Sequence, residues 1–272
     1  MRYLSAAGPF LRRRLKPPNI PDPTPVHTAS FADRKSCYID VYTPNVAGPH
    51  PSALIVHGGG FVGGSRRMSS VRVVIEHLLQ QGFVVASLDY RLVRPWGPFL
   101  DGQVLDVRDG ARWWHENAPG FGADPTRSVI IGLSAGGGLG VMAADAAPFS
   151  RFIGVYGAYD LTLLPARWAT ATSLIRSRHR RDHSSQSPLM MGHFEQPALL
   201  IHGDIDPLAV PEHSRRLADA RAARGLPTEL CWIEGAVHGY LQDGASHPHS
   251  AQTLSLIDSF LSPLSELVQP SP

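Results

Sequence analysis

Short apolar stretches alternate with helix-spaced segments along the chain from about residue 28 onward. The apolar stretches are rich in Val, Ile and Leu, as buried strands are, and the first two read as an antiparallel pair. Between the later stretches, apolar side chains recur every three or four residues, which is typical of amphipathic helices. This alternation predicts a mostly parallel sheet with helices on both faces. The eight predicted strands lie in residues 27–33, 37–44, 52–59, 83–92, 128–133, 152–159, 197–203 and 229–235. The predicted helices lie in residues 69–82, 101–118, the alanine-rich segment after 134, 211–224 and 249–262.

The first 27 residues do not share this alternation. They contain four basic side chains near residue 14 and five prolines between residues 17 and 25, so they favour neither a sheet nor a long helix. We interpret residues 1–27 as a basic, proline-rich arm and residues 28–268 as one α/β domain. A flap over a neighbouring cleft, a basic contact surface and a solvated tail all remain open as roles for the arm.

Composition excludes several classes of partner. The 272 residues are 43 % apolar and the formal net charge is only +2, with no basic stripe interleaved with aromatic residues, so we expect no nucleic-acid partner. No apolar run is long enough for a membrane span, and we expect none. The two cysteines, Cys37 and Cys231, fall in distant predicted strands, which favours a reduced, cytoplasmic protein. The histidines of residues 176–183 lack a nearby cysteine or carboxylate pair at ligand spacing, so we expect no metal site.

The densest cluster of glycines surrounds one hydroxyl group. Ser134 lies in Gly-Leu-Ser-Ala-Gly, between a predicted buried strand and a predicted helix. In that context the serine occupies a tight strand-to-helix turn where the flanking positions accept only the smallest side chains. We therefore expect Ser134 to be a nucleophile; the alternative is a glycine-rich packing contact between helix and sheet.

A second glycine cluster, His57-Gly58-Gly59-Gly60, ends the strand in residues 52–59. The backbone N–H groups of Gly59 and Gly60, together with that of Ala135, could stabilise an oxyanion. A phosphate-binding loop is the alternative, but it would normally bring a lysine after the glycines, and this chain continues with Phe61 and Val62. We expect His57 to hold this loop by a hydrogen bond.

A serine needs a general base, and the base needs an acid that fixes its tautomer. Asp204 and Asp206 follow the strand in residues 197–203, and His238 follows the last strand. We favour Asp206 as the acid because Pro207 holds its turn open, and expect Asp204 to act in the loop's own hydrogen bonds. His238 is the predicted base, with a structural histidine as the alternative, and His202 is expected to be a support.

These segments together resemble α/β-hydrolases of the hormone-sensitive-lipase-like esterase group. The matching pieces are HGGGFVGGS, SLDYRL, FGADPTR, GLSAGGGLG, GDIDPL and VHGY, in the family's order between about residues 30 and 265. The resemblance implies an α/β-hydrolase fold, Ser134 as nucleophile, His238 as base and Asp206 as its acid, with no cofactor. It implies Gly59, Gly60 and Ala135 as oxyanion donors, and framework roles for Asp89, Arg91, Asp124 and Arg127. Compared with the family, the excursion at residues 160–188 is short, so we expect a small cap.

The expected substrate is a small ester with a short acyl group, because a small cap suits it better than a lipid chain. The substrate-pocket candidates are Phe61, Trp96, Leu164 and Trp168. An arylformamidase or another amidase is the first alternative, since kynurenine formamidases have similar HGG and SAGG segments. A non-catalytic binding protein with the same fold is a remote alternative. Assembly into a homodimer is left open.

Overall fold

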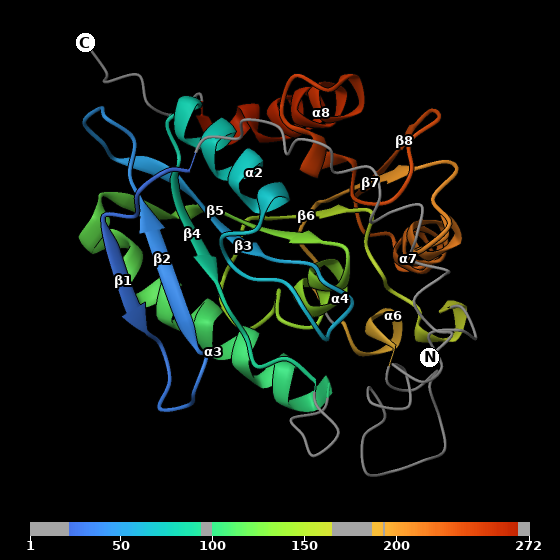
Figure 1. The fold of residues 1–272 in the computed structure, drawn as a ribbon, viewed down its shortest axis with the longest axis horizontal. Helices are drawn as coiled ribbons and strands as arrows, with labels where there is room; N and C mark the ends of the chain where they lie inside the picture. The colour runs from blue at the N-terminus through green and yellow to red at the C-terminus, as the bar shows by residue number, and fades with distance from the viewer. Residues whose placement is uncertain (1–21, 94–99, 165–186, 193, 266–272) are drawn as a thin grey trace, which may run out of the picture.

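A computed structural model describes residues 22–93, 100–164, 187–192 and 194–265 of this chain. These residues form one eight-stranded sheet with the order β1-β2-β4-β3-β5-β6-β7-β8 (Figure 1). The strands are β1 His27–Ser30, β2 Tyr38–Tyr42, β3 His50–Val56, β4 Val84–Leu88, β5 Ala123–Leu133, β6 Arg151–Val155, β7 Ala198–Gly203 and β8 Thr228–Ile233. The helices are α2 Ser69–Gln80, α3 Leu100–Asn117, α4 Ala135–Val141, α6 Pro188–Met191, α7 Glu212–Ala222 and α8 Pro248–Ser265, with short 3₁₀ turns η1 Ala118–Phe121, η2 Leu161–Leu163 and η4 Tyr240–Asp243.

The sheet is mostly parallel. Strand β2 pairs antiparallel with both β1 and β4, and every pair from β4 to β8 is parallel. The register aligns the last residues of the parallel strands, with Val56 opposite both Leu88 and Gly132. The loops that follow β3, β5, β7 and β8 therefore lie at the same edge of the sheet, where open α/β sheets hold their ligands.

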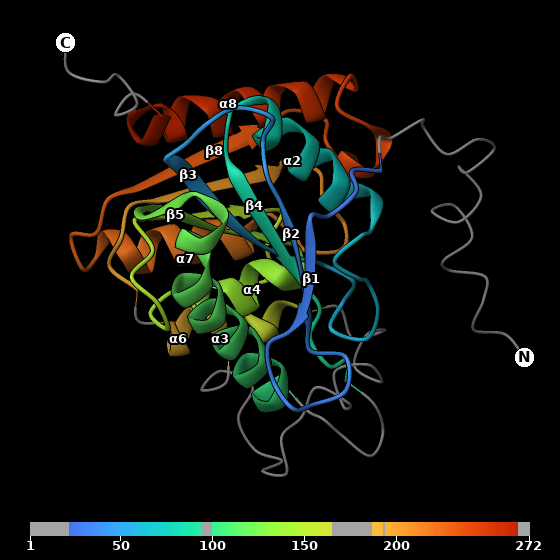
Figure 2. The same cartoon turned by 90° about the vertical axis from the view of Figure 1, so that its left-hand side faces the viewer.

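Each face of the sheet is covered by its own layer of helices, as the turned view makes clear (Figure 2). The alternation of side chains along β3 shows why: Leu54 and Val56 belong to one apolar cluster, and Ala53 and Ile55 belong to the other. The first cluster contains apolar side chains of α3, α4 and α7, and the second those of α2 and α8. A strand buried on both sides is accordingly apolar throughout its central part.

The predicted mostly parallel sheet with helices on both faces is confirmed, including the antiparallel opening pair. Helix α2 stops where expected, because Gly82 takes a φ of +80° and returns its N–H to the Leu79 carbonyl oxygen. The helix after Ser134 is shorter than its alanine content suggests. Helix α4 ends at Val141, and residues 142–148 form turns. The arm through residue 21 and residues 165–186 of the expected cap lie outside the described residues.

Candidate active site

Ser134 occupies the turn between β5 and α4, with φ 55° and ψ −120°. A positive φ is strained for a residue with a Cβ, so the surrounding backbone must hold it. The Ser134 N–H donates to the Val155 carbonyl oxygen at 3.0 Å. A Cβ on Gly132 would collide with the Gly136 carbonyl oxygen, and one on Gly136 would collide with that of Val56. Gly136 is therefore required by the close approach of the turn to β3, and Gly132 by the close approach of the first turn of α4.

Three side chains from three loops lie in line at this turn. Ser134 Oγ is 2.8 Å from His238 Nε2, and His238 Nδ1 is 2.6 Å from Asp206 Oδ2. Since an ionised carboxylate can only accept, Nδ1 carries the proton and Nε2 is left to accept from the Ser134 hydroxyl. The structure thus brings together the three side chains predicted as nucleophile, base and acid.

The environment of Asp206 keeps it ionised. Its Oδ1 accepts the N–H groups of Leu208 and Ala209 at 2.8 and 3.0 Å, and its side chain is fully buried. Burial alone would raise the pKa of Asp206, but the hydrogen bonds from His202 and His238 outweigh it and lower the pKa to about 2. A permanent negative charge therefore faces the His238 ring and can stabilise its protonated form.

The neighbours of Asp206 have the supporting positions that the sequence predicts. We call residues 203–209 the carboxylate loop. The buried His202 donates from Nε2 to the Ala209 carbonyl oxygen at 2.7 Å, lies 3.3 Å from Asp206 Oδ2, and has Ser214 Oγ at 2.7 Å from Nδ1. Asp204 is exposed, and its Oδ1 accepts the Gly235 N–H at 2.7 Å.

The expected oxyanion donors lie next to Ser134. We call residues 57–64 the oxyanion loop. A Cβ on Gly58 would lie 2.9 Å from the Ser134 Cβ, so this loop and the serine turn are in direct contact. Gly59 and Gly60 have φ values of 121° and 60°, and their N–H groups donate to no acceptor in the described part of the chain. The Ala135 N–H, at the first position of α4, likewise precedes the helical hydrogen bonds.

The oxyanion loop is held by buried polar groups at its base. His57 is fully buried, donates from Nδ1 to the Gly58 carbonyl oxygen at 2.6 Å, and stacks on Tyr90 with ring centroids 4.3 Å apart. The Tyr90 hydroxyl donates to the His57 carbonyl oxygen at 2.9 Å. Burial lowers the pKa of His57, so its ring is neutral and supports the loop as expected.

Two supporting residues were not found by sequence reasoning. Tyr156 follows β6 with a φ of 41°, and its ring meets the His238 ring edge-on, with centroids 5.1 Å apart. Gln103 of α3 reaches the oxyanion loop and is considered further below. No local motif identifies either residue, because each acts on a segment far away in the sequence.

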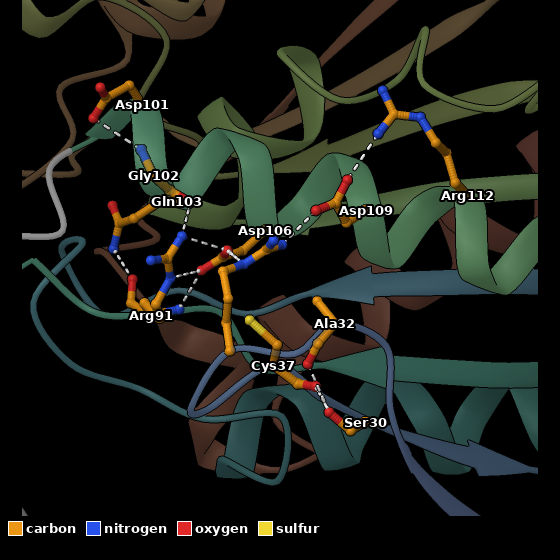
Figure 3. Close-up of polar contacts among 11 residues, drawn as sticks. Ser30, Ala32, Cys37, Arg91, Asp101, Gly102, Gln103, Asp106, Asp109 and Arg112 are labelled. Atoms are coloured by element: carbon orange, nitrogen blue, oxygen red, sulfur yellow. Dashed lines mark hydrogen bonds and ion pairs between the residues drawn. The ribbon is translucent and has the colours of Figure 1, made fainter.

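The four framework residues form polar pairs, although Asp89 and Arg91 do not pair with each other. Asp89 accepts the backbone N–H of Arg66 at 2.7 Å and pairs with its guanidinium group. Arg91 donates to Asp106 from Nε and Nη2 at 2.7 and 2.8 Å (Figure 3).

The remaining framework pair is local. Arg127 donates from Nε to Asp124 Oδ2 at 3.0 Å. Each of these framework residues therefore fixes a loop through a polar pair.

Two of the four substrate-pocket candidates lie in the described part of the chain. Phe61 is 2 % exposed and its side chain belongs to the apolar core beneath the oxyanion loop. Leu164 is partly buried and packs against the same core. Trp96 and Trp168 lie outside the described residues, so the lining of the pocket stays a prediction.

The described residues also bear on membrane insertion and on metal binding. None of their helices is both long and apolar enough to cross a membrane. Over the same ranges, no group of three or more His, Cys, Asp or Glu side chains is arranged to hold a metal ion.

Known proteins are similar to this chain in sequence and in fold. The model of the family described as BD-FAE matches residues 39–160, which include the oxyanion loop and Ser134. Esterase LipC of Mycobacterium tuberculosis is 29 % identical over 237 residues, covering 76 % of this chain and 58 % of the esterase. The non-reducing polyketide synthase stbA of Stachybotrys bisbyi is 38 % identical over 231 residues, covering 80 % of this chain and 9 % of the synthase. The chain thus spans less than two thirds of the length of either relative.

Solved structures share the whole fold. Thermogutta terrifontis esterase 2 phosphonylated by sarin superposes with a TM-score of 0.76 at 23 % identity, covering 94 % of this chain and 99 % of that one. The butyrate-bound form of the same esterase gives 0.73 at 24 % identity, with 95 % and 100 % covered. A truncated carbohydrate esterase from gut microbiota gives 0.76 at 17 % identity, with 90 % and 100 % covered. These structures show the fold of the chain, an α/β-hydrolase sheet with helices on both faces, and the sequence matches agree with the resemblance found in the sequence.

Proposed function

We propose that the protein is a serine carboxylesterase that hydrolyses small esters with short acyl groups. The observation that carries this proposal is the continuous chain of contacts from Ser134 Oγ through both nitrogens of His238 to Asp206 Oδ2. A histidine with a purely structural role needs neither a serine hydroxyl at one ring nitrogen nor a buried carboxylate at the other. The same arrangement activates a hydroxyl as a nucleophile.

The first stage forms an acyl-enzyme. Ser134 Oγ attacks the ester carbonyl carbon while His238 Nε2 takes the hydroxyl proton, and Asp206 stabilises the resulting imidazolium. The carbonyl oxygen gains the negative charge and is stabilised by the N–H groups of Gly59, Gly60 and Ala135. The carbonyl then re-forms as the bond to the alkoxy oxygen breaks, and His238 returns the proton to the departing alcohol.

The second stage repeats this chemistry with water. His238 removes a proton from water as the water oxygen attacks the acyl carbon, and the same N–H groups stabilise the second oxyanion. The bond to Ser134 Oγ breaks, His238 returns the proton to Oγ, and the carboxylic acid leaves. These steps need no group besides the side chains, backbone amides and water.

The short acyl preference has two supports. The excursion expected to form the cap, residues 160–188, is short for this group of esterases, which leaves little chain to enclose a long acyl group. Related solved structures contain small acids: Thermogutta terrifontis esterase 2 is described with propionate and with butyrate bound.

Replacement of the nucleophile tests the function. Ser134→Ala should reduce kcat for p-nitrophenyl butyrate by about 10⁶-fold, because the remaining groups cannot form the acyl-enzyme. A fluorophosphonate probe should label the wild-type protein and fail to label the variant. A series of p-nitrophenyl esters of increasing acyl length, with N-formylkynurenine beside it, measures kcat/KM for the acyl preference and for the formamidase alternative. Full turnover by Ser134→Ala, or higher kcat/KM for N-formylkynurenine than for every ester, would refute the proposal.

A further inference from the structure

The oxyanion loop has an unusual backbone that local contacts do not fully explain. Gly59, Gly60 and Phe61 have consecutive φ values of 121°, 60° and 67°. Glycine adopts such values freely, but Phe61 carries a side chain and is strained there. The Gly59 carbonyl oxygen accepts the N–H groups of Val62 and Gly63, which closes the turn on one side of this strained residue. The orientation of the Phe61 peptide therefore has to be fixed from elsewhere.

Gln103 supplies that contact from α3. Its side chain is fully buried, and Nε2 donates to the Phe61 carbonyl oxygen at 2.8 Å and to the Arg91 carbonyl oxygen at 2.9 Å. The backbone N–H of Val93 donates to the same Phe61 oxygen at 3.0 Å. Gln103 joins the oxyanion loop to the segment that follows β4, and no other side chain in the described ranges donates to the Phe61 carbonyl oxygen.

The oxygen of the Gln103 amide, Oε1, is buried and has no hydrogen-bond partner among the described residues. The fold therefore keeps the two hydrogen bonds from Nε2 at the cost of leaving Oε1 unsatisfied. The amide cannot simply turn over, because Oε1 would then face two carbonyl oxygens. A buried acceptor left without a partner costs free energy, and such costs recur where a structure maintains a functional geometry.

The partners of Gln103 are themselves fixed. Asp106, one helical turn further along α3 and fully buried, accepts the backbone N–H of Arg91 at 3.0 Å as well as two guanidinium hydrogen bonds. Figure 3 shows Gln103 and Asp106 on the same side of α3, both facing Arg91. Arg34 donates from Nε to Asp106 Oδ1 at 2.9 Å. Gln103 thus acts from a rigid base, because the helix and the Arg91 segment are tied together independently of it.

We propose that Gln103 is a positioning residue that orients the backbone N–H groups of the oxyanion loop for the transition state. It acts through the Phe61 carbonyl oxygen, which lies directly after the Gly60–Phe61 peptide and therefore sets the rotation of that strained turn. Substrate binding in the ground state needs this alignment less than the tetrahedral oxyanion does, because only the oxyanion carries a full negative charge. The inference rests on the proposed esterase function and adds a residue to it.

The test replaces the amide by a side chain of similar length without a donor. Gln103→Met should lower kcat for p-nitrophenyl butyrate by about 10- to 100-fold and change KM by less than about threefold, since the donors are misaligned rather than removed. A trifluoromethyl ketone forms a tetrahedral adduct with the serine. Its inhibition constant should rise by the same factor by which kcat/KM falls.

Asn117→Leu is the matched control. Asn117 is the last residue of the same helix, and its Nδ2 donates to the Trp113 carbonyl oxygen at 2.8 Å. The variant therefore also loses a hydrogen bond from a side-chain amide to a backbone carbonyl, but one that does not involve the oxyanion loop. It should retain wild-type kcat even where its melting temperature falls as far as that of Gln103→Met. Equal kcat in both variants, or a KM increase that accounts for the whole loss, would overturn the proposal.

A second measurement keeps this proposal separate from the esterase assignment. Amide hydrogen exchange of the peptide covering residues 57–64 should be faster in Gln103→Met than in the wild type and unchanged in Asn117→Leu. This readout does not depend on turnover. Unchanged exchange overturns the positioning role, whereas faster exchange in a protein that hydrolyses no ester and binds no fluorophosphonate would refute the esterase function alone.

Discussion

The oxyanion loop and the carboxylate loop leave the same edge of the sheet, after β3 and β7, yet they are held in different ways. In the carboxylate loop, Asp206 accepts from the backbone two and three residues ahead, and His202 bonds Ala209 seven residues ahead. In the oxyanion loop, the supporting hydroxyl of Tyr90 and the amide of Gln103 come from 33 and 42 residues away. One loop is organised largely by its own sequence, and the other by the segments packed against it.

This difference separates two kinds of group in the proposed mechanism. The carboxylate loop positions one charged side chain, and a buried acceptor with local N–H donors does this with little distant help. The oxyanion loop positions bare backbone N–H groups, which have no side chain to anchor them. The direction of each N–H group depends on the rotation of its peptide. Backbone strain and hydrogen-bond donors from distant segments therefore position these groups, whereas local N–H donors position the Asp206 side chain in the other loop.

The largest expected effect comes from changing the charge in the carboxylate loop without changing its shape. In Asp206→Asn, the amide oxygen can still accept from Leu208 and Ala209, but an NH₂ group faces His238 Nδ1 and forces the wrong tautomer. We expect kcat to fall by about 10⁴-fold while the fold is retained, as measured by steady-state kinetics and circular dichroism.

Asp204→Asn is the control for that experiment. Its amide oxygen can still accept the Gly235 N–H, and Asp204 does not contact His238 in the structure. This variant should stay within about threefold of wild-type kcat, since only an exposed charge is lost. If Asn at position 204 is as damaging as Asn at position 206, the assignment of Asp206 as the acid is wrong.

A smaller effect is expected from distorting the oxyanion loop. In Gly59→Ala, the new Cβ would collide with the Gly63 carbonyl oxygen, and a φ of 121° is unfavourable for alanine. The loop must move, and we expect kcat to fall by about 10²- to 10³-fold, as for the loss of one oxyanion donor. Initial rates with p-nitrophenyl butyrate, measured well below the melting temperature of each variant, give this loss.

Gly63→Ala makes the same substitution four residues away in the same loop. Its Cβ would lie 3.5 Å from the Gly59 carbonyl oxygen, which is ordinary contact, so both activity and melting temperature should stay near the wild type. If Gly63→Ala and Gly59→Ala lose activity equally, the loop responds to any added side chain. The specific role of the Gly59 conformation would then be disproved.

The two loops also show how much of this molecule could be predicted from its sequence. The sheet, its helices and the loop positions follow from periodicity and glycine placement, and the roles expected for His202 and Asp204 depend on neighbours close in the chain. Asp124 and Arg127 pair as expected for the same reason. The partner of Arg91 proved to be Asp106, and Gln103 and Tyr156 were missed, because these contacts arise only when distant segments pack together. Phe61 was predicted to line the pocket; its side chain belongs to the apolar core, and its place in the pocket stays a prediction.

The smallest expected effect is a change in stability with pH that belongs to the carboxylate loop. The pKa of Asp206 is lowered to about 2 from 3.8, so its ionised form stabilises the fold above about pH 3.8, and that contribution is lost as pH falls through 2. The full contribution is about 2 kcal/mol, and roughly half of it should be gone at pH 3. Urea denaturation of the wild type and Asp206→Asn between pH 5 and 3 measures it as the decrease in the difference between their free energies of unfolding. Because the other carboxylates are common to both proteins, their titration cancels in this difference. A difference that stays constant across this range would mean that His202 and His238 do not hold the Asp206 pKa down. The carboxylate loop would then owe its geometry to the backbone N–H groups of Leu208 and Ala209 alone.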